Sequence, residues 1–381
     1  MATVDRDIYK LMLITNNLSA EQTVSAYLEN YHRAFTGSCF VGDRWYVFYT
    51  YCNGTHHTFG GIIVCNYSDD FGATWSDDIS IYTGEEVLAA HPEWLIEEPR
   101  NTQDARDCRA LVMPDNTILI TVTVVIGYNW VAEDTDPADP TNVDIREITK
   151  PYITTALRIP LNEGGDGLDL DNIVISYITE TGGSVCGMAL HNNVVYQPCY
   201  GYPTEYGREM KLYKSLDYGV TWSLVGEIFE RGDEAAVYFL GETMYVSARP
   251  IDNNVPGLRK KSTNYGLTWD AGTNNPIRLD GLWGYNMPNN CVFIHGREND
   301  TVYKTTGYIL RGETLNSPIL RLKNAGSMDT GYGTTEKKNG VYYITYHDGP
   351  KRTFVTYRYP SGWTGVYFKT INANIFELLC Y

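Results

Sequence analysis

The chain has 381 residues, of which 31 are Tyr, 8 are Trp and 35 are Gly, and its formal net charge is −16. This acidity argues against nucleic acid or an anionic membrane surface as a partner, because both require a basic face. The aromatic and glycine content is typical of a large all-β domain with many tight turns.

The start of the chain, Met1–Asp7, lacks a basic region followed by an apolar one, so no secretory signal is visible. No segment approaches the length of a membrane span. The compartment stays open between the cytoplasm and export by another route. We expect a single domain over residues 1–381, in which residues 1–30 form a lead-in with a closing strand and one short helix lies at Ser19–Tyr31, starting at Ser19.

Six strand–turn–strand pairs follow, each with an apolar strand, a polar or glycine-containing turn and a second strand rich in aromatic and β-branched residues. They are Cys39–Tyr51, Ala110–Val125, Met188–Tyr200, Ala236–Arg249, Cys291–Tyr308 (with its turn at Arg297-Glu298) and Thr334–Tyr346. The polar segment Val131–Asp144 is interpreted as a long loop between units. Eight isolated cysteines without a C-x-x-C pair favour buried core thiols over disulfides or a metal site.

Three turns share the pattern S-x-(D/N)-x-G-x-T-W and begin at Ser68, Ser215 and Ser262. The acidic or amide side chain at the third position can bond to the turn backbone, the glycine permits positive φ, and the Trp packs on the sheet below. The second and third copies start 47 residues apart and the first and second 147 apart, close to three such periods. A period of this size, together with six hairpins, predicts a six-bladed β-propeller in which these turns are structural.

This motif order resembles the sialidase (neuraminidase) superfamily, whose members are six-bladed propellers with Asp-box turns, three arginines and a Tyr/Glu pair. The segment Asp233–Arg249, followed by the turn at Ser262, is similar to the family's order of Glu, hairpin, Arg and Asp box. Gly331-Tyr332-Gly333-Thr334 lies before the last hairpin, where the family has its catalytic Tyr. The resemblance covers roughly residues 30–350.

The resemblance implies that Tyr332 is the nucleophile, that Glu234 is its base, and that Arg33, Arg249 and Arg311 bind the substrate carboxylate, with Arg321 competing for the role of Arg311. A phenol suits an anionic substrate because a carboxylate nucleophile would be repelled, and it needs a base to take its proton. Three guanidiniums can bind a carboxylate in bidentate fashion at any working pH, and we expect them to create a strongly positive spot. Asp348 is the expected support for the first arginine.

The family's acid/base aspartate has no counterpart in Tyr51–Gly60, where His57 lies at or beside the missing position. Histidine can transfer protons near neutral pH. The alternatives are an aspartate from elsewhere, or the loss of hydrolysis. The candidate aspartates are Asp104, Asp107, Asp134, Asp136 and Asp139.

The resemblance therefore implies an exo-acting, retaining glycoside hydrolase that releases sialic acid or a related carboxylated sugar from a glycan. It implies no metal and no organic cofactor. Two alternatives stay open, namely a non-hydrolytic propeller that binds sialylated glycans and an enzyme that performs intramolecular transfer. The oligomeric state is not encoded in any pattern that we identified.

Overall fold

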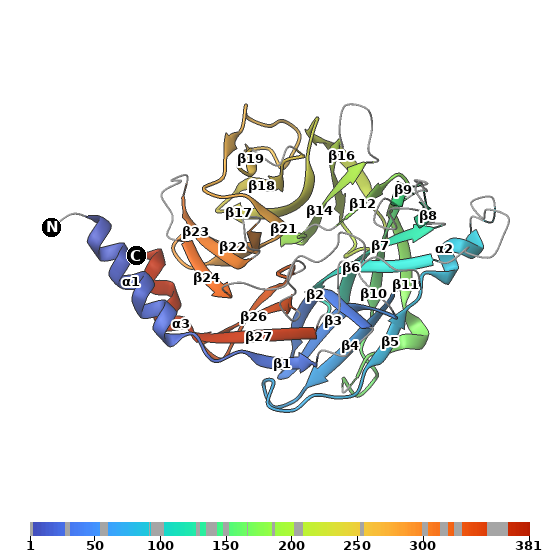
Figure 1. Ribbon diagram of the computed structural model, residues 1–381, viewed down its shortest axis with the longest axis horizontal. Helices are drawn as coiled ribbons and strands as arrows, with labels where there is room; N and C mark the ends of the chain where they lie inside the picture. The colour runs from blue at the N-terminus through green and yellow to red at the C-terminus, as the bar shows by residue number, and fades with distance from the viewer. Residues whose placement is uncertain are drawn as a thin grey trace.

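In the computed structural model, blades of antiparallel sheet stand around a common axis and form a ring (Figure 1). The structure describes residues 3–26, 31–53, 60–90, 92, 103–126, 130–134, 143–147, 152–165, 167–184, 187–201, 209–251, 255–298, 304–312, 319–323, 330–348 and 365–381. These residues form the six blades of an all-β propeller, so the predicted fold class is confirmed.

Each blade runs outward from its first strand. Blades one to three consist of β2 (Tyr31–Val41), β3 (Arg44–Asn53), β4 (Ile62–Ser68) and β5 (Ile79–Tyr82); β6 (Gln103–Val112), β7 (Ile118–Ile126), β10 (Tyr152–Ile159) and β11 (Val174–Thr179); and β12 (Gly182–Gly183), β13 (Ala189–His191), β14 (Val194–Gly201), β15 (Met210–Ser215) and β16 (Ser223–Phe229). Blades four to six consist of β17 (Asp233–Leu240), β18 (Thr243–Arg249), β19 (Leu258–Ser262) and β20 (Thr273–Asn274); β21 (Leu279–Met287), β22 (Cys291–Glu298), β23 (Lys304–Arg311) and β24 (Ile319–Lys323); and β25 (Thr335–Lys338), β26 (Val341–Asp348), β27 (Gly365–Asn372) and β1 (Gln22–Ser25).

The two ends of the chain close the ring, because β1 from the N-terminal region pairs antiparallel with β27 as the outer strand of the sixth blade. Apolar side chains fill the spaces between neighbouring blades. Each of the six blade interfaces has its own buried cluster, for example one between blades one and two and another between blades four and five. Closure of the ring leaves none of the described blades with an unpaired apolar face, and it fixes which strand ends meet at the axis.

The predicted helix at Ser19–Tyr31 is wrong. The helix is α1 (Thr3–Asn17), whose Leu11 and Ile14 pack with Leu18 on the core between blades five and six. The Ser19 hydroxyl accepts a hydrogen bond from the Thr370 amide of β27 at 2.8 Å, so this residue joins a sheet instead of starting a helix.

The other helical segments are short: α2 (Glu85–Ala90), η2 (Leu170–Asn172), α3 (Ala373–Phe376) and η3 (Glu377–Cys380). In Figure 1, α1 and α3 lie together beside the sixth blade. Within the described part of the chain, no helix combines the length and the hydropathy that a membrane crossing requires.

The three repeated turns adopt one hydrogen-bonded geometry, each between the third and fourth strands of its blade. The serine accepts from the glycine amide four residues later at 2.7–2.8 Å, and the third residue accepts from the threonine amide at 2.8–3.0 Å. The glycines have φ between 89° and 95°. Ser262 pairs with Met244, at the far end of β18 from Arg249, so the predicted structural role of these turns agrees with their position.

Two predicted elements need correction. The predicted hairpin Cys291–Tyr308 covers the second and third strands of its blade, and Arg297-Glu298 lie within β22 instead of in a turn. The inner hairpin is β21–β22, which turns at Asn289 and Asn290 with φ of 56° and 57°. The segment Val131–Asp144 contributes to a paired arm, β8 (Trp130–Asp134) with β9 (Val143–Glu147), inserted within blade two.

The prediction of core thiols is confirmed for the described cysteines. All seven are free and buried: Cys39, Cys52, Cys65, Cys108, Cys199, Cys291 and Cys380. Cys186 lies outside the described residues.

Candidate active site

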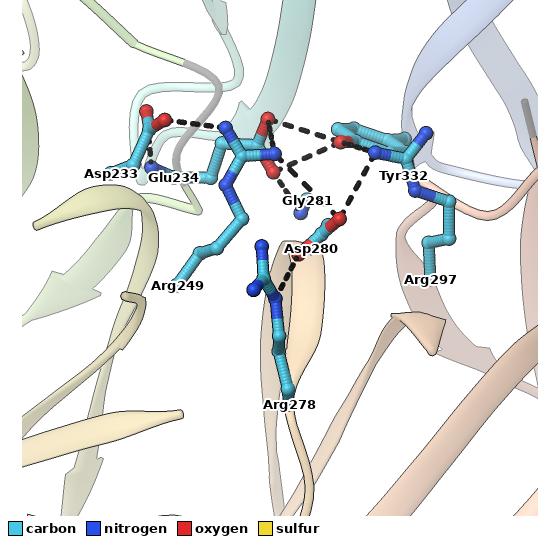
Figure 2. Close-up of polar contacts among 8 residues, drawn as sticks. All are labelled: Asp233, Glu234, Arg249, Arg278, Asp280, Gly281, Arg297 and Tyr332. Atoms are coloured by element: carbon cyan, nitrogen blue, oxygen red, sulfur yellow. Dashed lines mark hydrogen bonds and ion pairs between the residues drawn. The ribbon is translucent and has the colours of Figure 1, made fainter. Parts of the chain in front are cut away.

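Glu234 and Tyr332, which lie 98 residues apart in sequence, meet at the axis of the ring. The Tyr332 hydroxyl lies 3.0 Å from each carboxylate oxygen of Glu234 and donates to that group. Arg297 Nη2 donates to the same hydroxyl at 2.8 Å, and its guanidinium stands 4.7 Å from the centre of the Tyr332 ring. Figure 2 shows this phenol between a carboxylate and a guanidinium.

Glu234 and Tyr332, which we call the couple, are both buried, with exposed fractions of 6% and 2% respectively. Burial raises the pKa of Glu234 to about 7; Arg249 opposes that shift, whereas Asp280 and Asp233 add to it. Burial also raises the pKa of Tyr332 well above its usual value, against the lowering effect of Arg297. Because the phenol is the weaker acid, it keeps its proton at rest and the carboxylate can receive it.

Arg249 ends β18 and bonds to carboxylates from two blades. It forms ion pairs with Asp233, with Glu234 at 2.9 Å and with Asp280 at 3.7 Å. Asp233 and Arg249 are cross-strand partners in the β17–β18 register, so the hairpin itself brings them together. The predicted proximity of Arg249 to Glu234 is therefore present in the structure.

Asp280 links the fourth and fifth blades. This carboxylate is 1% exposed and accepts from Arg297 Nη2 at 3.0 Å and from Arg278 Nε at 3.3 Å, in addition to its ion pair with Arg249. Asp280 and Arg297 are cross-strand partners in β21–β22, just as Asp233 and Arg249 are in β17–β18. Two successive blades therefore present an aspartate and an arginine at the same end (Figure 2).

The backbone of Gly281 holds the Glu234 carboxylate in position next to Tyr332. Its amide donates to Glu234 Oε2 at 2.6 Å, and its φ of 59° belongs to the left-handed region. A Cβ at this position would lie 2.1 Å from Cδ1 of Tyr332, closer than non-bonded carbon atoms can approach. Glycine is therefore required where the Tyr332 ring meets this strand.

Sequence reasoning did not identify Arg278, Asp280, Gly281 or Arg297. The signal that could have identified two of them is the pattern of an acidic residue at the start of an inner strand and an arginine at the end of the next. Asp233 to Arg249 spans 16 residues and Asp280 to Arg297 spans 17. The pattern was hidden because the turn of the fifth hairpin was placed at Arg297-Glu298 instead of Asn289-Asn290.

The structure corrects the expectation for Arg311. This residue is opposite Cys291, six residues from Arg297 along β22, a separation of roughly 20 Å at the usual rise of a strand. Its Nε donates to the carbonyl of Leu379 in η3, at the other end of the blade. The competing candidate, Arg321, lies on the outer strand β24 with a half-exposed side chain 3.9 Å from Glu298. The arginine that the fifth blade contributes to the cluster is Arg297.

Arg33 lies on the inner strand β2, and its contacts reach its own blade and the segment that follows β1 of the sixth blade. It donates to Ala26 O at 2.8 Å, pairs with Asp78 at 3.2 Å and stands over the ring of Tyr51 at 5.3 Å. Asp348, the expected support for Arg33, pairs with Lys323 at 2.6 Å, and Asp78 is an acidic partner of Arg33 that the sequence did not indicate. These contacts fix the Arg33 guanidinium between Ala26, Asp78 and Tyr51.

The candidates for the proton donor divide into two groups. His57, Asp136 and Asp139 lie outside the described residues, and of Asp134 only the backbone, in β8, is described. Asp104 and Asp107 lie on the inner strand β6 of blade two, with Arg106 between them at 3.5 Å and 3.8 Å. Both carboxyls are buried, and burial raises the pKa of each, to about 7 for Asp107.

Comparison with solved structures places this arrangement in a known fold. A *Dyadobacter fermentans* protein of unknown function matches 93% of this chain over 99% of its own length, with 16% identity and a TM-score of 0.70. *Trypanosoma rangeli* sialidase (14% identity, TM-score 0.62) matches 94% of this chain, and the Hadza microbial sialidase Hz136 (12%, 0.62) matches 93%.

These matches extend over 59% of the *T. rangeli* sialidase and 68% of Hz136, so the chain spans about three fifths of the former. No family model matches the sequence, and no curated protein matches it either. The chain has the six-bladed fold of the sialidases, which confirms the resemblance at the level of architecture.

Proposed function

We propose that this protein is an exo-acting, retaining glycoside hydrolase that removes a terminal sialic acid, or a related carboxylated sugar, from a glycan. The observation that supports this proposal is the Tyr332 hydroxyl, which is bonded to both oxygens of Glu234 and to Arg297 with Arg249 alongside. A phenol that faces a buried base and two guanidiniums suits attack on an anionic sugar better than it suits packing. *T. rangeli* sialidase, which shares the fold, has been solved in complex with sialic acid.

In the first half of the reaction, the Tyr332 oxygen bonds to the anomeric carbon while its proton passes to Glu234. The glycosidic bond breaks, and the departing oxygen keeps the electron pair and takes a proton from an acid. In the second half, water replaces the phenol at the anomeric carbon and gives a proton to the conjugate base of that acid, while Glu234 returns its proton to the phenol oxygen. Two displacements at one carbon retain its configuration.

Arg249 and Arg297 would bind the sugar carboxylate, and Arg33 is the candidate for the third contact because β2 begins at the same end of the ring. Guanidinium groups suit this role because they bind carboxylates with paired, charge-assisted hydrogen bonds. Asp233 and Asp280 hold Arg249 and Arg297 in place, so an incoming carboxylate has to share these arginines with internal partners.

The test is turnover of 4-methylumbelliferyl α-sialoside by the intact protein and by Tyr332→Phe. We expect release of fluorophore by the wild type, loss of about 10²-fold or more in the variant, and a sugar adduct on the Tyr332 peptide after reaction with a 2,3-difluoro sialic acid. Proton NMR of the first product identifies the configuration and shows whether water or a hydroxyl of the same sugar is the acceptor. Equal activity of Tyr332→Phe and wild type would exclude the proposed nucleophile.

A second candidate, a propeller that binds sialylated glycans without cleaving them, is favoured by one observation. Arg249 and Arg297 are already paired with internal carboxylates, and the Tyr332 hydroxyl is buried beneath them. Calorimetric titration with methyl α-sialoside, in parallel with the turnover assay, separates the two. Saturable binding with no release of methanol or fluorophore would support the binding protein.

A further inference from the structure

Four inner strands bulge near the same end of the ring. The register shifts lie between Ala34 and Gly37 in β2, Arg106 and Arg109 in β6, Asp233 and Ala235 in β17, and Asp280 and Trp283 in β21. A bulge inserts an extra residue and turns its side chain away from the alternation of the strand, which is how sheets aim side chains at active sites. The inserted residues include Phe35, Asp107, Glu234 and Gly281.

Three of these four residues already belong to the site. Glu234 is the carboxylate of the couple, Gly281 supports it, and the Phe35 ring meets the Tyr332 ring edge-on at 5.1 Å. Asp107 is the fourth, and it carries the one carboxyl at these bulges besides that of Glu234. Its φ of 62° is left-handed, a conformation that is unfavourable for a residue with a Cβ. Strain of this kind concentrates at functional positions.

Direct contacts connect the Asp107 bulge with the backbone of the Tyr332 segment. The thiol of Cys108 donates to Phe35 O at 3.1 Å, and the next amide, that of Thr36, donates to Tyr332 O at 3.0 Å. The Asp107 amide is itself anchored on the Thr50 hydroxyl at 3.1 Å. The β6 bulge is therefore held next to the β2 bulge, which in turn is held against Tyr332.

The Asp107 carboxyl is buried and incompletely satisfied. It is 3% exposed, and its Oδ1 has no hydrogen-bond partner among the described residues. Its ion-pair contact with Arg106 is long, at 3.8 Å, and Arg106 shares its Nε with Asp104. A buried carboxyl oxygen without a partner carries a desolvation cost unless a proton or a ligand satisfies it.

We propose that Asp107 is the acid that protonates the departing aglycone oxygen, which makes it a catalytic residue of the proposed hydrolase. As the glycosidic carbon–oxygen bond breaks, the oxygen keeps the bonding pair and takes the proton from the Asp107 carboxyl. When water later attacks the Tyr332-bound sugar, the Asp107 carboxylate takes a proton from that water. Asp107 thus ends protonated and Glu234 ends ionised, as both began. This inference depends on the proposed function.

The charges around Asp107 suit this role. Burial raises its pKa to about 7; Arg106 and Arg109 oppose that shift, and Asp104 and Glu234 add to it. An ionised Glu234 disfavours ionisation of Asp107, which favours the proton on Asp107. The active form has one proton on Asp107 and none on Glu234.

The test compares a substrate that needs an acid with one that does not. Methyl α-sialoside has a poor leaving group, whereas 4-methylumbelliferyl α-sialoside has a good one. We expect Asp107→Asn to lower kcat/KM by about 10²- to 10⁴-fold on the methyl glycoside, the usual contribution of a general acid, and by less than about tenfold on the aryl glycoside. Asp104→Asn is the matched control, since it removes another buried carboxylate beside Arg106; it should change both substrates by the same factor.

Equal losses on the two substrates in Asp107→Asn, or full activity on the methyl glycoside, would overturn the inference. So would a selective loss on the methyl glycoside in His57→Ala with none in Asp107→Asn. A wild type inactive on both substrates would instead overturn the proposed function. If Asp107→Asn does not fold, the wild-type pH profile decides. Activity on the methyl glycoside should fall at high pH as Asp107 ionises, and activity on the aryl glycoside should not.

Discussion

Substitution of Gly281 by Ala tests whether the backbone of β21 sets the position of the nucleophile. The new Cβ would lie 2.1, 2.4 and 2.5 Å from Cδ1, Cγ and Cε1 of Tyr332. Carbon atoms need about 3.5 Å, so the ring or the strand must shift by roughly 1.4 Å. Because displacement of a reacting group by about 1 Å costs on the order of 10²-fold in rate, we expect kcat/KM to fall about 10²-fold, equivalent to about 2.7 kcal/mol.

The loss should lie in kcat, because the added Cβ meets the ring of the proposed nucleophile. Alanine at a φ of 59° also destabilises the fold by roughly 1–2 kcal/mol, which a thermal melt measures separately. Gly284→Ala is the control on the same strand. Its Cβ would meet Cδ1 of Tyr238 at 3.1 Å, a contact that is distant from the couple and relieved by a small adjustment. Wild-type kcat in Gly281→Ala would refute the reasoning.

Three further predictions follow from the same geometry. Arg297→Ala removes a contact to the Tyr332 hydroxyl and should lower kcat/KM about 10²-fold or more in steady-state kinetics. Arg311→Ala is the control, and it should stay near wild type because Arg311 lies at the other end of the blade. A larger loss in Arg311→Ala than in Arg297→Ala would contradict the placement of the two arginines. Glu234 must be ionised to act as the base, and its pKa is raised to about 7. We therefore expect kcat/KM for the aryl glycoside to fall about tenfold for each pH unit below that value. A flat pH profile down to pH 5 would exclude Glu234 as the base. Ser215→Ala leaves the buried Gly219 amide without its 2.7 Å acceptor and should cost about 1–3 kcal/mol in denaturant unfolding with kcat unchanged; loss of activity in the folded variant would show that the turn affects the site.

The architecture was predictable because it repeats. Three copies of one turn and six hairpins recur at blade spacing, and each copy depends on local chemistry that a short segment contains in full. For the same reason the convergence of Glu234, Arg249 and Tyr332 could be anticipated, since a correct count of strands places their ends around one axis. The helix α1 was missed because its apolar residues serve a core built from the other end of the chain.

The rest of the site could not be predicted because it depends on non-local events at bulges. Asp107 was one of five candidate aspartates, but nothing in Asp107 or Gly281 as residue types indicates that a register shift occurs at either position. The assignment of the third arginine depended on one turn, and the misplaced turn at Arg297-Glu298 moved the prediction to Arg311, about 20 Å away along the strand. The predicted acid, His57, lies outside the described residues, so its role stays a prediction.

The charge balance of the cluster differs from the positive spot expected from three arginines. Among the residues drawn in Figure 2, the three arginines Arg249, Arg278 and Arg297 face the three carboxylates of Asp233, Glu234 and Asp280. The charges of these six side chains sum to zero when all six are ionised. In a chain of net charge −16, such a cluster gives little long-range attraction for an anionic sugar. Its carboxylates instead hold the guanidiniums in fixed positions, so selection of a carboxylated sugar would depend on short-range paired hydrogen bonds. Protonation of Glu234 leaves the cluster with one net positive charge, so binding of an anion would favour protonated Glu234. The chemical step needs Glu234 ionised, because Glu234 has to take the proton of Tyr332. Binding of the sugar carboxylate and activation of the nucleophile therefore favour opposite protonation states of Glu234.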